Sequence, residues 1–336
     1  AVWIGLRNYT DATDDLRMRI YIKHADLIIC CARDIETYVS KKFRLRSLDD
    51  AKYELNVEHN DRRPHFGTGT AYVCTLTNLY DIDGIVSDSV KDEPNPPLPM
   101  ANQHGDPIKY ICSMGRADDQ KMFWHMLKTF KLIRMEIPET RLLILGAGDF
   151  GKYKRMAKSM SIYDSVIFAG EQLNPYKYLK YGCINWMTSR NEGFPNALVE
   201  GMALGLVTVS TNCMTGPAEI LTESGNVYTS TDILNCRIKS ETHTDAEVMP
   251  ESPIALYGEY GILTPAMTRN RDMDFAHITW EHYNLARVII DLLRDQDMMN
   301  RYRDAAIKRA MDYGYEAYRS RFMRLADSAV CRKHYD

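Results

Sequence analysis

The sequence predicts an α/β protein made of two Rossmann-like domains, and three observations support this fold class. Between residues 110 and 210, short apolar runs alternate with segments of helical periodicity, which is typical of a parallel sheet covered by helices on both faces. A proline cluster at residues 91–107, KDEPNPPLPMANQHGDP, cannot continue a helix or a strand and indicates a linker. The length of 336 residues also exceeds one compact core.

We expect the elements to follow in this order. Residues 1–92 form a first α/β segment, with strands over 26–32 and 72–78 and a helix over 34–43. Residues 93–107 form the linker. Residues 108–275 form a second domain, with strands over 110–114, 141–145, 165–169, 183–187 and 207–210 and helices over 121–136, 152–160 and 195–204.

The remaining segments carry weaker patterns. Residues 222–260 are polar without sustained periodicity, which predicts a loop or insertion with room for a small hairpin. Residues 276–330 contain two strongly periodic helices, the first beginning at Trp280. Seven basic residues in the second helix indicate either a solvated face or a surface for anionic lipid: Arg301, Arg303, Lys308, Arg309, Arg319, Arg321 and Arg324.

Composition excludes several function classes. Hydrophobic residues at 45% and charged residues at 26% are ordinary for a globular protein, and a net charge of −3 gives no general affinity for nucleic acid. No segment has the long apolar run of a membrane helix, so we expect membrane contact to be peripheral. The eight cysteines lack CxxC spacing and indicate reduced core thiols of a cytoplasmic protein. The chain starts in an apolar run, VWIGL, without a signal-peptide pattern, and we expect it to be part of something longer.

The strongest functional pattern is a βαβ unit over residues 183–221, CINWMTSRNEGFPNALVEGMALGLVTVSTNCMTGPAEIL. Glu192 follows its first strand, and Glu200 lies eight positions later on its helix. Ligands of open α/β sheets bind at the carboxyl ends of the strands. Pro195 suits a first helical turn, whose unpaired N–H groups stabilise anions such as phosphate. A carboxylate accepts hydrogen bonds from vicinal hydroxyls, so the unit predicts a site for a phosphorylated, hydroxyl-rich molecule.

The segment SRNEGFPNALVEGMALG resembles the signature of the retaining, GT-B-fold nucleotide-sugar glycosyltransferases of family 4 (glycosyl transferases group 1), of the polysaccharide-biosynthesis type. The resemblance implies that Glu192 lies against the transferred sugar and that Glu200 binds the nucleotide ribose. It also implies two Rossmann-like domains facing across a cleft, with residues 1–92 as the later part of the N-terminal, acceptor-side domain. The early part of that domain, with its acceptor loop, is then missing here. TNLYDIDGIVSDS resembles the last strand and turn of that domain, and the last helix of such proteins crosses back onto it.

A second constellation, SMGRADDQK, places Arg116 and Lys121 just past a strand end. Two cations at the mouth of a parallel sheet stabilise a diphosphate leaving group, although loop cations are also commonly just solvated. The segment resembles the family's GR(x4)K motif, whose Arg and Lys grip the donor diphosphate. One departure is visible, because Met122 stands where the family often has Gly.

Other positions are assigned by resemblance with less specific motifs. The turn GAGDFG and the segment GEQLNPYKYL resemble donor-pocket and base-pocket segments. The expected donor-binding residues, besides Glu200, are Gly146, Gly148, Gly170, Leu173, Gly193, Phe194, Pro195 and Asn196. The family's N-domain histidine has no clear counterpart, and His24, His59 and His65 are candidates by location only. No Asp-x-Asp pair resembles a metal clamp, since Asp81 and Asp83 belong to the interdomain turn, so we expect metal-independent transfer without a cofactor.

The leading hypothesis is a retaining glycosyltransferase, with Glu192, Arg116 and Lys121 as catalytic residues. It would move a hexose or N-acetylhexosamine from a nucleoside diphosphate sugar, UDP favoured over GDP, to a glycan or lipid-linked acceptor. One alternative is a non-catalytic nucleotide-sugar-binding subunit of a glycosylation complex. A dinucleotide oxidoreductase is disfavoured, because the turn GAGDFG lacks the third glycine of that fingerprint.

Overall fold

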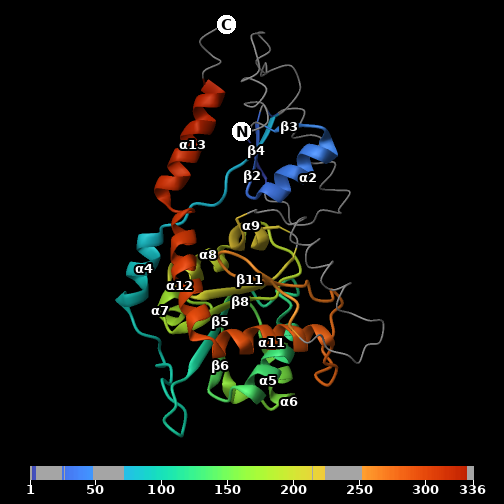
Figure 1. Ribbon diagram of the computed structural model, residues 1–336, viewed down its shortest axis with the longest axis vertical. Coiled ribbons are helices and arrows are strands. Elements are labelled where there is room, and N and C mark those ends of the chain that lie inside the picture. Colours follow the sequence, from blue (N-terminus) through green and yellow to red (C-terminus); the bar gives the residue numbers. More distant parts are fainter. Residues whose placement is uncertain are drawn as a thin grey trace.

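The chain folds around two separate β-sheets (Figure 1). The computed structural model describes residues 2–4, 25, 27–47, 72–213, 215–223 and 252–330. A smaller sheet from the N-terminal segment lies above a larger one in the view of Figure 1, and a long C-terminal helix runs beside the smaller sheet. The α/β class predicted from the sequence is confirmed.

The smaller sheet has the strand order β1-β2-β4-β3 and is parallel throughout. Its strands are β1 (Val2–Ile4), β2 (Leu27–Cys30), β3 (Arg46–Ser47) and β4 (Tyr72–Thr75). Helix α2 (Arg33–Phe43) follows β2 and buries Ile35 and Val39, which are four residues apart and therefore share one helix face. Acidic residues in its first turn and lysines in its last turn complement the helix dipole.

The larger sheet has the order β10-β11-β9-β8-β5-β6-β7. All its pairings are parallel except that of β10 with β11. Numbered along the chain, the parallel strands read 3-2-1-4-5-6 from β7 to β11, which is the order of a Rossmann sheet. These strands are β5 (Lys109–Met114), β6 (Thr140–Leu145), β7 (Val166–Gly170), β8 (Gly182–Met187), β9 (Val207–Thr211) and β11 (Ile262–Thr264).

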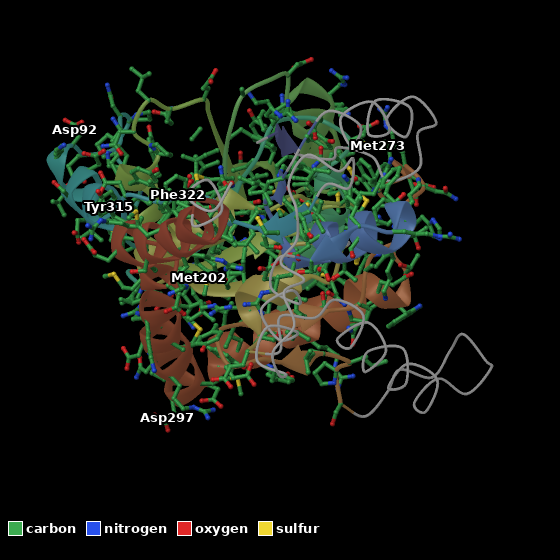
Figure 2. All side chains as sticks on the ribbon, turned by 90° about the horizontal axis from the view of Figure 1, so that it is seen from above. Asp92, Met202, Met273, Asp297, Tyr315 and Phe322 are labelled. Carbon is green, nitrogen blue, oxygen red and sulfur yellow. The ribbon has the colours of Figure 1, made fainter. Side chains whose placement is uncertain are left out.

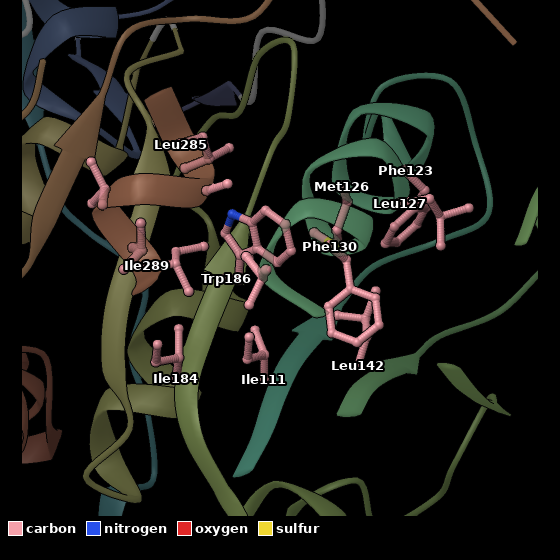
Figure 3. Packing of buried hydrophobic residues seen from close by; sticks show 14 of the residues in the cluster. Ile111, Phe123, Met126, Leu127, Phe130, Leu142, Ile184, Trp186, Leu285 and Ile289 are labelled. Carbon is pink, nitrogen blue, oxygen red and sulfur yellow. The ribbon is translucent and has the colours of Figure 1, made fainter. Parts of the chain in front are cut away.

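Helices cover both faces of this sheet, which explains why its central strands are buried along most of their length. Figure 3 shows the indole ring of Trp186, on β8, between Met126 and Phe130 of α5 (Phe123–Glu136) and Leu285 and Ile289 of α11 (Trp280–Arg294). Burial of each side chain of this kind contributes roughly 1.5–3 kcal/mol. The core therefore fixes β8 and β5, the two strands that lead into the predicted site.

Two further helices of the larger domain lie close to the site. Helix α8 (Asn196–Ala203) follows β8, and the short α9 (Pro217–Leu221) follows β9. A Cβ atom on Gly201 would lie 2.3 Å from Nδ2 of Asn185, so only glycine lets α8 approach β8 this closely. The Asn185 amide in turn donates to the main-chain oxygens of Ala197 and Leu198. Helix α6 (Gly151–Ser159) and the one-turn α7 (Tyr176–Leu179) complete the layers.

The segment TNLYDIDGIVSDS differs from the expected strand and turn. Residues Ile82–Lys91 form helix α4, because the Asp81 side chain caps its first turn by accepting a hydrogen bond from the Gly84 N–H at 2.9 Å. The helix packs on α7 and α8, and Asn174 donates to its Asp88 carbonyl. The structure therefore places α4 with the larger sheet, although it precedes the proline cluster in sequence.

The C-terminal region also differs from the two expected helices. The second predicted helix is divided into α12 (Gln296–Met311) and α13 (Tyr315–Val330), with a break at residues 312–314 that ends in Gly314. Helix α13 packs on the smaller sheet through Leu325 and Tyr318, which contact apolar residues of β4. Figure 2 shows Phe322 on this helix and Tyr315 at its start; both are partly exposed.

The segment 222–260 contains strand β10 (Leu256–Tyr257), which pairs antiparallel with β11 and forms the small hairpin that the sequence allowed. Residues 224–251 lie outside the described residues. Six cysteines are described, and all six are free thiols in or next to the cores. Among the helices that the structure describes, none is both long and apolar enough to cross a membrane.

Candidate functional site

The candidate site lies where the chain direction reverses across the larger sheet, between β5 and β8. Chain connections from β5 lead towards β6 and β7 on one side, and those from β8 lead towards β9 and β11 on the other. Loops after neighbouring parallel strands diverge at such a point and leave a crevice at the carboxyl ends. Residues 115–122 leave the end of β5 and residues 188–195 leave the end of β8, so both sequence motifs meet here.

The central contact joins Lys121 to Glu192. The Lys121 Nζ atom lies 2.6 Å from Oε1 of Glu192, and the two side chains are only 16% and 9% exposed. Charge-assisted hydrogen bonds of this length are strong when water is largely excluded. An ammonium group has three N–H donors, and this contact uses one of them. The Glu192 carboxylate is therefore held in place by Lys121. The Lys121 ammonium keeps N–H donors that can bind a second anionic group.

Hydrogen bonds between the two loops hold this pair in position. The Thr188 hydroxyl donates to the Lys121 carbonyl at 3.0 Å. The Arg190 N–H donates to the Gln120 carbonyl at 2.8 Å, and the Gln120 amide donates to the Asn191 carbonyl at 2.8 Å. From the far side, the Thr215 hydroxyl donates to the Glu192 carbonyl.

Met122 explains how Lys121 reaches this position. The predicted helix over 121–136 begins at Phe123, because Met122 has a left-handed backbone with φ of 47°. Residues other than glycine rarely adopt this conformation. The left-handed residue turns the chain before the helix and leaves Lys121 in the loop. Met122 therefore stands at a position where the backbone conformation favours the glycine that the family often has. The Met122 side chain is buried.

Arg116 does not join the central pair. Its guanidinium lies 3.2 Å from Asp118 and its side chain is 62% exposed. In the described part of the chain, no hydrogen bond or ion pair links Arg116 to Glu192. The structure therefore places it on the solvent side of the loop, with a long side chain that is free to change rotamer.

The predicted glycines bring the loops after β5, β6 and β7 together. A Cβ atom on Gly146 would lie 2.0 Å from the Gly115 carbonyl oxygen, and the Gly146 φ of 144° also favours glycine. The Gly146 N–H donates to the Gly170 carbonyl at 2.8 Å. Gly148 also has positive φ and packs near Ala117. Leu173, by contrast, is fully exposed.

The segment after Glu192 contacts the N-terminal part of the chain. The Asn196 Oδ1 atom accepts hydrogen bonds from the Asn78 amide and the Tyr80 hydroxyl, both at 2.7 Å. The Phe194 ring is buried, with its centroid 5.1 Å from that of Tyr313. The Phe194 and Asn196 side chains therefore fix the loop through contacts within the protein. The groups of this loop that remain to contact a ligand are those of the backbone. Sequence reasoning assigned Phe194 and Asn196 to the donor but missed their partners, because no motif marks contacts across more than 100 residues.

Glu200 sits on α8, with Pro195 at the N-cap and no side chain capping the helix start. Burial raises the pKa of the Glu200 carboxyl above its usual value of 4.5. Tyr80 and Tyr176 lie near enough for its charge to raise their own pKa values, after burial as the larger cause. Across the residues that the structure describes, Glu200 has no hydrogen-bond partner and no ion pair. A half-buried carboxylate without a donor is suited to accept hydrogen bonds from ligand hydroxyls.

The N-terminal side of the site is represented by Cys31, which sequence reasoning treated only as a core thiol. A Cβ atom on Gly193 would lie 3.5 Å from the Cys31 Sγ atom. Cys31 directly follows β2, so the carboxyl ends of the two sheets face each other here. The candidate histidines His24, His59 and His65 lie outside the described residues.

Comparison with known proteins identifies a family and relatives that this chain resembles. Residues 99–233 match the family described as glycosyl transferases group 1. An uncharacterized glycosyltransferase of Methanocaldococcus jannaschii is 27% identical over 307 residues, 90% of this chain and 63% of that protein. A lipopolysaccharide 1,6-galactosyltransferase of Escherichia coli is 31% identical over 125 residues, 33% of this chain and 35% of that protein. The chain thus spans less than two thirds of the length of either relative.

Solved structures share the fold. The Anabaena protein HepE, crystallised in complex with UDP, superposes with a TM-score of 0.61 at 14% sequence identity, covering 95% of this chain and 69% of HepE. At this identity the likeness concerns the fold alone. Residues 99–233 thus match the glycosyl transferases group 1 family, and the described residues have the GT-B fold.

Proposed function

We propose that this chain binds a nucleoside diphosphate sugar, preferably a UDP sugar, and transfers the sugar to a glycan or lipid-linked saccharide. The observation that carries the proposal is the Lys121–Glu192 pair at the reversal point of the Rossmann sheet, with the unpartnered carboxylate of Glu200 on the helix that follows. A cation, a held carboxylate and a free carboxylate match the three parts of such a donor: diphosphate, sugar and ribose.

The diphosphate is assigned to the cations. Lys121 keeps two N–H donors beyond the one given to Glu192, and Arg116 lies in the same loop with an exposed guanidinium. Both charges oppose the negative charge that develops on the diphosphate as the bond to the sugar breaks, which lowers the barrier when the groups are already in place. Neither role needs a metal ion, and metal-independent transfer is part of the proposal.

The sugar and the ribose are assigned to the two glutamates. Glu192 accepts hydrogen bonds from the sugar ring substituents, and Glu200 accepts them from the ribose hydroxyls, as acidic residues of dinucleotide sites do. The backbone of residues 193–196 presents N–H groups of the uncapped start of α8 to sugar hydroxyls or phosphate. The segment 170–179 is assigned to the base, through backbone groups.

The transfer proceeds with retention in this proposal. The bond between the anomeric carbon and the diphosphate oxygen breaks, and its electron pair leaves with the diphosphate. The acceptor hydroxyl oxygen bonds to the same face of that carbon and gives its proton to the departing oxygen. The Lys121 ammonium holds Oε1 of Glu192 at 2.6 Å, which weakens this carboxylate as a nucleophile, so it acts by binding and by stabilising positive charge on the sugar.

The relatives support this choice of substrate class. The Escherichia coli relative is a lipopolysaccharide galactosyltransferase, and the Anabaena neighbour holds UDP. We infer the classes of donor and acceptor from the chemistry of Lys121, Glu192 and Glu200 together with these two proteins.

A panel of radiolabelled donors tests the proposal. The full chain is incubated with UDP-glucose, UDP-galactose, UDP-N-acetylglucosamine and GDP-mannose, and released or transferred label is measured. We expect turnover of at least one UDP sugar. Calorimetry with UDP, GDP and NAD accompanies the assay. UDP binding with every donor untouched would instead favour a non-catalytic binding subunit, and NAD binding without UDP or GDP would favour an oxidoreductase.

A further inference from the structure

A pocket of about 190 Å³ lies where four segments of the chain meet, next to the donor segment, because its lining residue Tyr313 contacts Phe194. Its wall combines the start of α2, the segment after β4, α9 and the junction of α12 with α13. The polar side chains that matter to its chemistry are Arg33, Thr77, Glu219, Arg309, Asp312 and Arg321. Three guanidinium groups around a small pocket make its electrostatics unusual, because each carries a full charge at any physiological pH.

One of the three arginines is already neutralised. Arg309 lies 3.0 Å from the Asp312 carboxylate. Its guanidinium also donates to the main-chain oxygens of Glu219 and Ile220, at 2.7 and 3.0 Å. These contacts commit Arg309 to holding α12 against α9. It shapes the pocket and contributes little free charge to it.

The other two arginines retain donors. The Arg33 Nε atom lies 3.8 Å from Glu219, beyond hydrogen-bond distance, and the Arg33 side chain is 57% exposed. Arg321 is partly buried, and within the described ranges it has neither an ion pair nor a side-chain hydrogen bond. Two guanidinium groups from separate helices therefore face the same space, and each repels the other unless an anion lies between them.

Glu219 cancels these charges only in part. It is only 4% exposed, and its Oε2 atom accepts the Arg33 N–H at 2.8 Å, which satisfies the start of α2. Burial raises the pKa of the Glu219 carboxyl to about 7, against the smaller lowering effects of Arg33 and Arg321 and with a further increase from Asp34. Near neutral pH the carboxyl is therefore protonated in a large share of the molecules.

A third donor completes the set. Thr77 lines the pocket and is only 7% exposed. Its hydroxyl has no hydrogen-bond acceptor among the described residues. A ligand that fits two guanidinium groups and a hydroxyl is rich in acceptors, and guanidinium matches the geometry of phosphate oxygens. The pocket is smaller than the roughly 300 Å³ at which pockets for drug-sized ligands begin, so it fits one small anion or the end of a larger molecule.

We propose that this pocket is a phosphate-binding site, for inorganic phosphate or for a phosphoryl group carried on a larger molecule. Arg33 and Thr77 belong to the N-terminal part of the chain, whereas Arg321 belongs to α13. A bound phosphate joins these segments and replaces their repulsion by two charge-assisted contacts. Neither Lys121 nor Glu192 lines the pocket, so phosphate binding there does not depend on the proposed transfer activity.

Calorimetry with inorganic phosphate tests the site, at an ionic strength held constant with chloride. The full chain should bind one phosphate, and Arg321→Gln should weaken that binding at least about tenfold, because it removes a charge-assisted contact. Arg319→Gln is the matched control on the same helix, since Arg319 is 61% exposed and does not line the pocket, and it should bind as the unmodified chain does. Equal phosphate affinity in both variants, or no binding by the unmodified chain, would overturn the proposal.

Two further variants keep the test decisive. Thr77→Val removes the hydroxyl at nearly constant volume and should also weaken phosphate binding, so a failure of Arg321→Gln to fold leaves the site testable. Lys121→Met should leave phosphate binding unchanged. Phosphate binding that is lost in Lys121→Met and kept in Arg321→Gln would assign the anion to the donor site and contradict the proposal.

Titration with a second compound distinguishes free inorganic phosphate from a phosphoryl group on a larger molecule. Glycerol 3-phosphate carries the same group on a short alcohol. Binding of both titrants, each weakened by Arg321→Gln, supports a phosphoryl group on a larger molecule. Binding of inorganic phosphate alone, weakened in the same variant, supports the free ion as the ligand.

Discussion

The Lys121 ammonium lies 2.6 Å from the Glu192 carboxylate, and each residue comes from a different strand end of the same Rossmann sheet. Both side chains are largely removed from solvent, so the attraction between the two charges is screened less than in an exposed ion pair. The pair fixes the position of the carboxylate and the direction of the cation before any ligand arrives. Preorganisation of this kind is what electrostatic catalysis requires.

Glu192→Gln should lower the turnover of the active UDP sugar about 100-fold while UDP itself binds nearly as before. The amide keeps the shape and a hydrogen-bond acceptor but loses the charge that stabilises positive charge on the sugar. Steady-state kinetics and UDP calorimetry measure the two effects. Glu136→Gln is the control, because Glu136 forms an exposed ion pair with Arg294 far from the site in sequence and fold. Unchanged turnover in Glu192→Gln would remove this residue from the reaction.

Glu200 is tested through the ribose that it is assigned to bind. UDP and 2′,3′-dideoxy-UDP are titrated into the unmodified chain and into Glu200→Gln. The unmodified chain should lose about tenfold or more in affinity when the hydroxyls are absent, because hydrogen bonds to a charged acceptor contribute roughly 1.5–3 kcal/mol. Glu200→Gln should distinguish the two nucleotides much less. Equal discrimination by both proteins would show that another group reads the ribose.

Glu219 should make the stability of the fold depend on pH. Its folded-state pKa of about 7 lies above the usual 4.5, so the native state binds more protons than the unfolded chain between these values. Stability from this group is therefore present below pH 4.5 and declines as pH rises to about 7, by at most about 3 kcal/mol. Denaturant midpoints at pH 5, 6, 7 and 8 should fall more steeply for the unmodified chain than for Glu219→Gln. Parallel curves would contradict the assignment.

Gly201→Ala should destabilise the protein by about 1–3 kcal/mol, because the new methyl group would lie 2.3 Å from the Asn185 amide and force α8 away from β8. Gly193→Ala is the contrasting substitution, since its Cβ atom would meet Cys31 at an ordinary contact distance of 3.5 Å. Thermal unfolding of both variants measures the difference. Similar melting temperatures for the two would show that α8 moves without cost.

The regular parts of the fold could be predicted from the sequence because they depend on local patterns. Apolar runs predicted β5, β6, β8 and β9. Because the carboxyl ends of parallel strands lie at the same edge of the sheet, the segments of Lys121 and Glu192 were expected together there. The direct contact between the two side chains could not be predicted, since it depends on the left-handed backbone of Met122.

What the sequence could not predict was long-range or depended on side-chain direction. Asn196 and Phe194 lie in the signature segment, yet their side chains contact Asn78, Tyr80 and Tyr313. Helices α12 and α13 share one continuous periodicity, which hides the break before Gly314. Arg116 lies in the expected loop, but the motif does not determine the rotamer that exposes it.

The most direct measurement of the central claim is the affinity of UDP for Lys121→Met. If the cation beside Glu192 binds the donor diphosphate, the dissociation constant for UDP should rise at least about tenfold, while that for uridine, which has no phosphate, stays the same. Lys180→Met is the control, because Lys180 pairs with the exposed Glu93 at the surface. UDP binding that is equally tight in Lys121→Met, Lys180→Met and the unmodified chain would contradict the assignment of the Lys121–Glu192 pair to the donor.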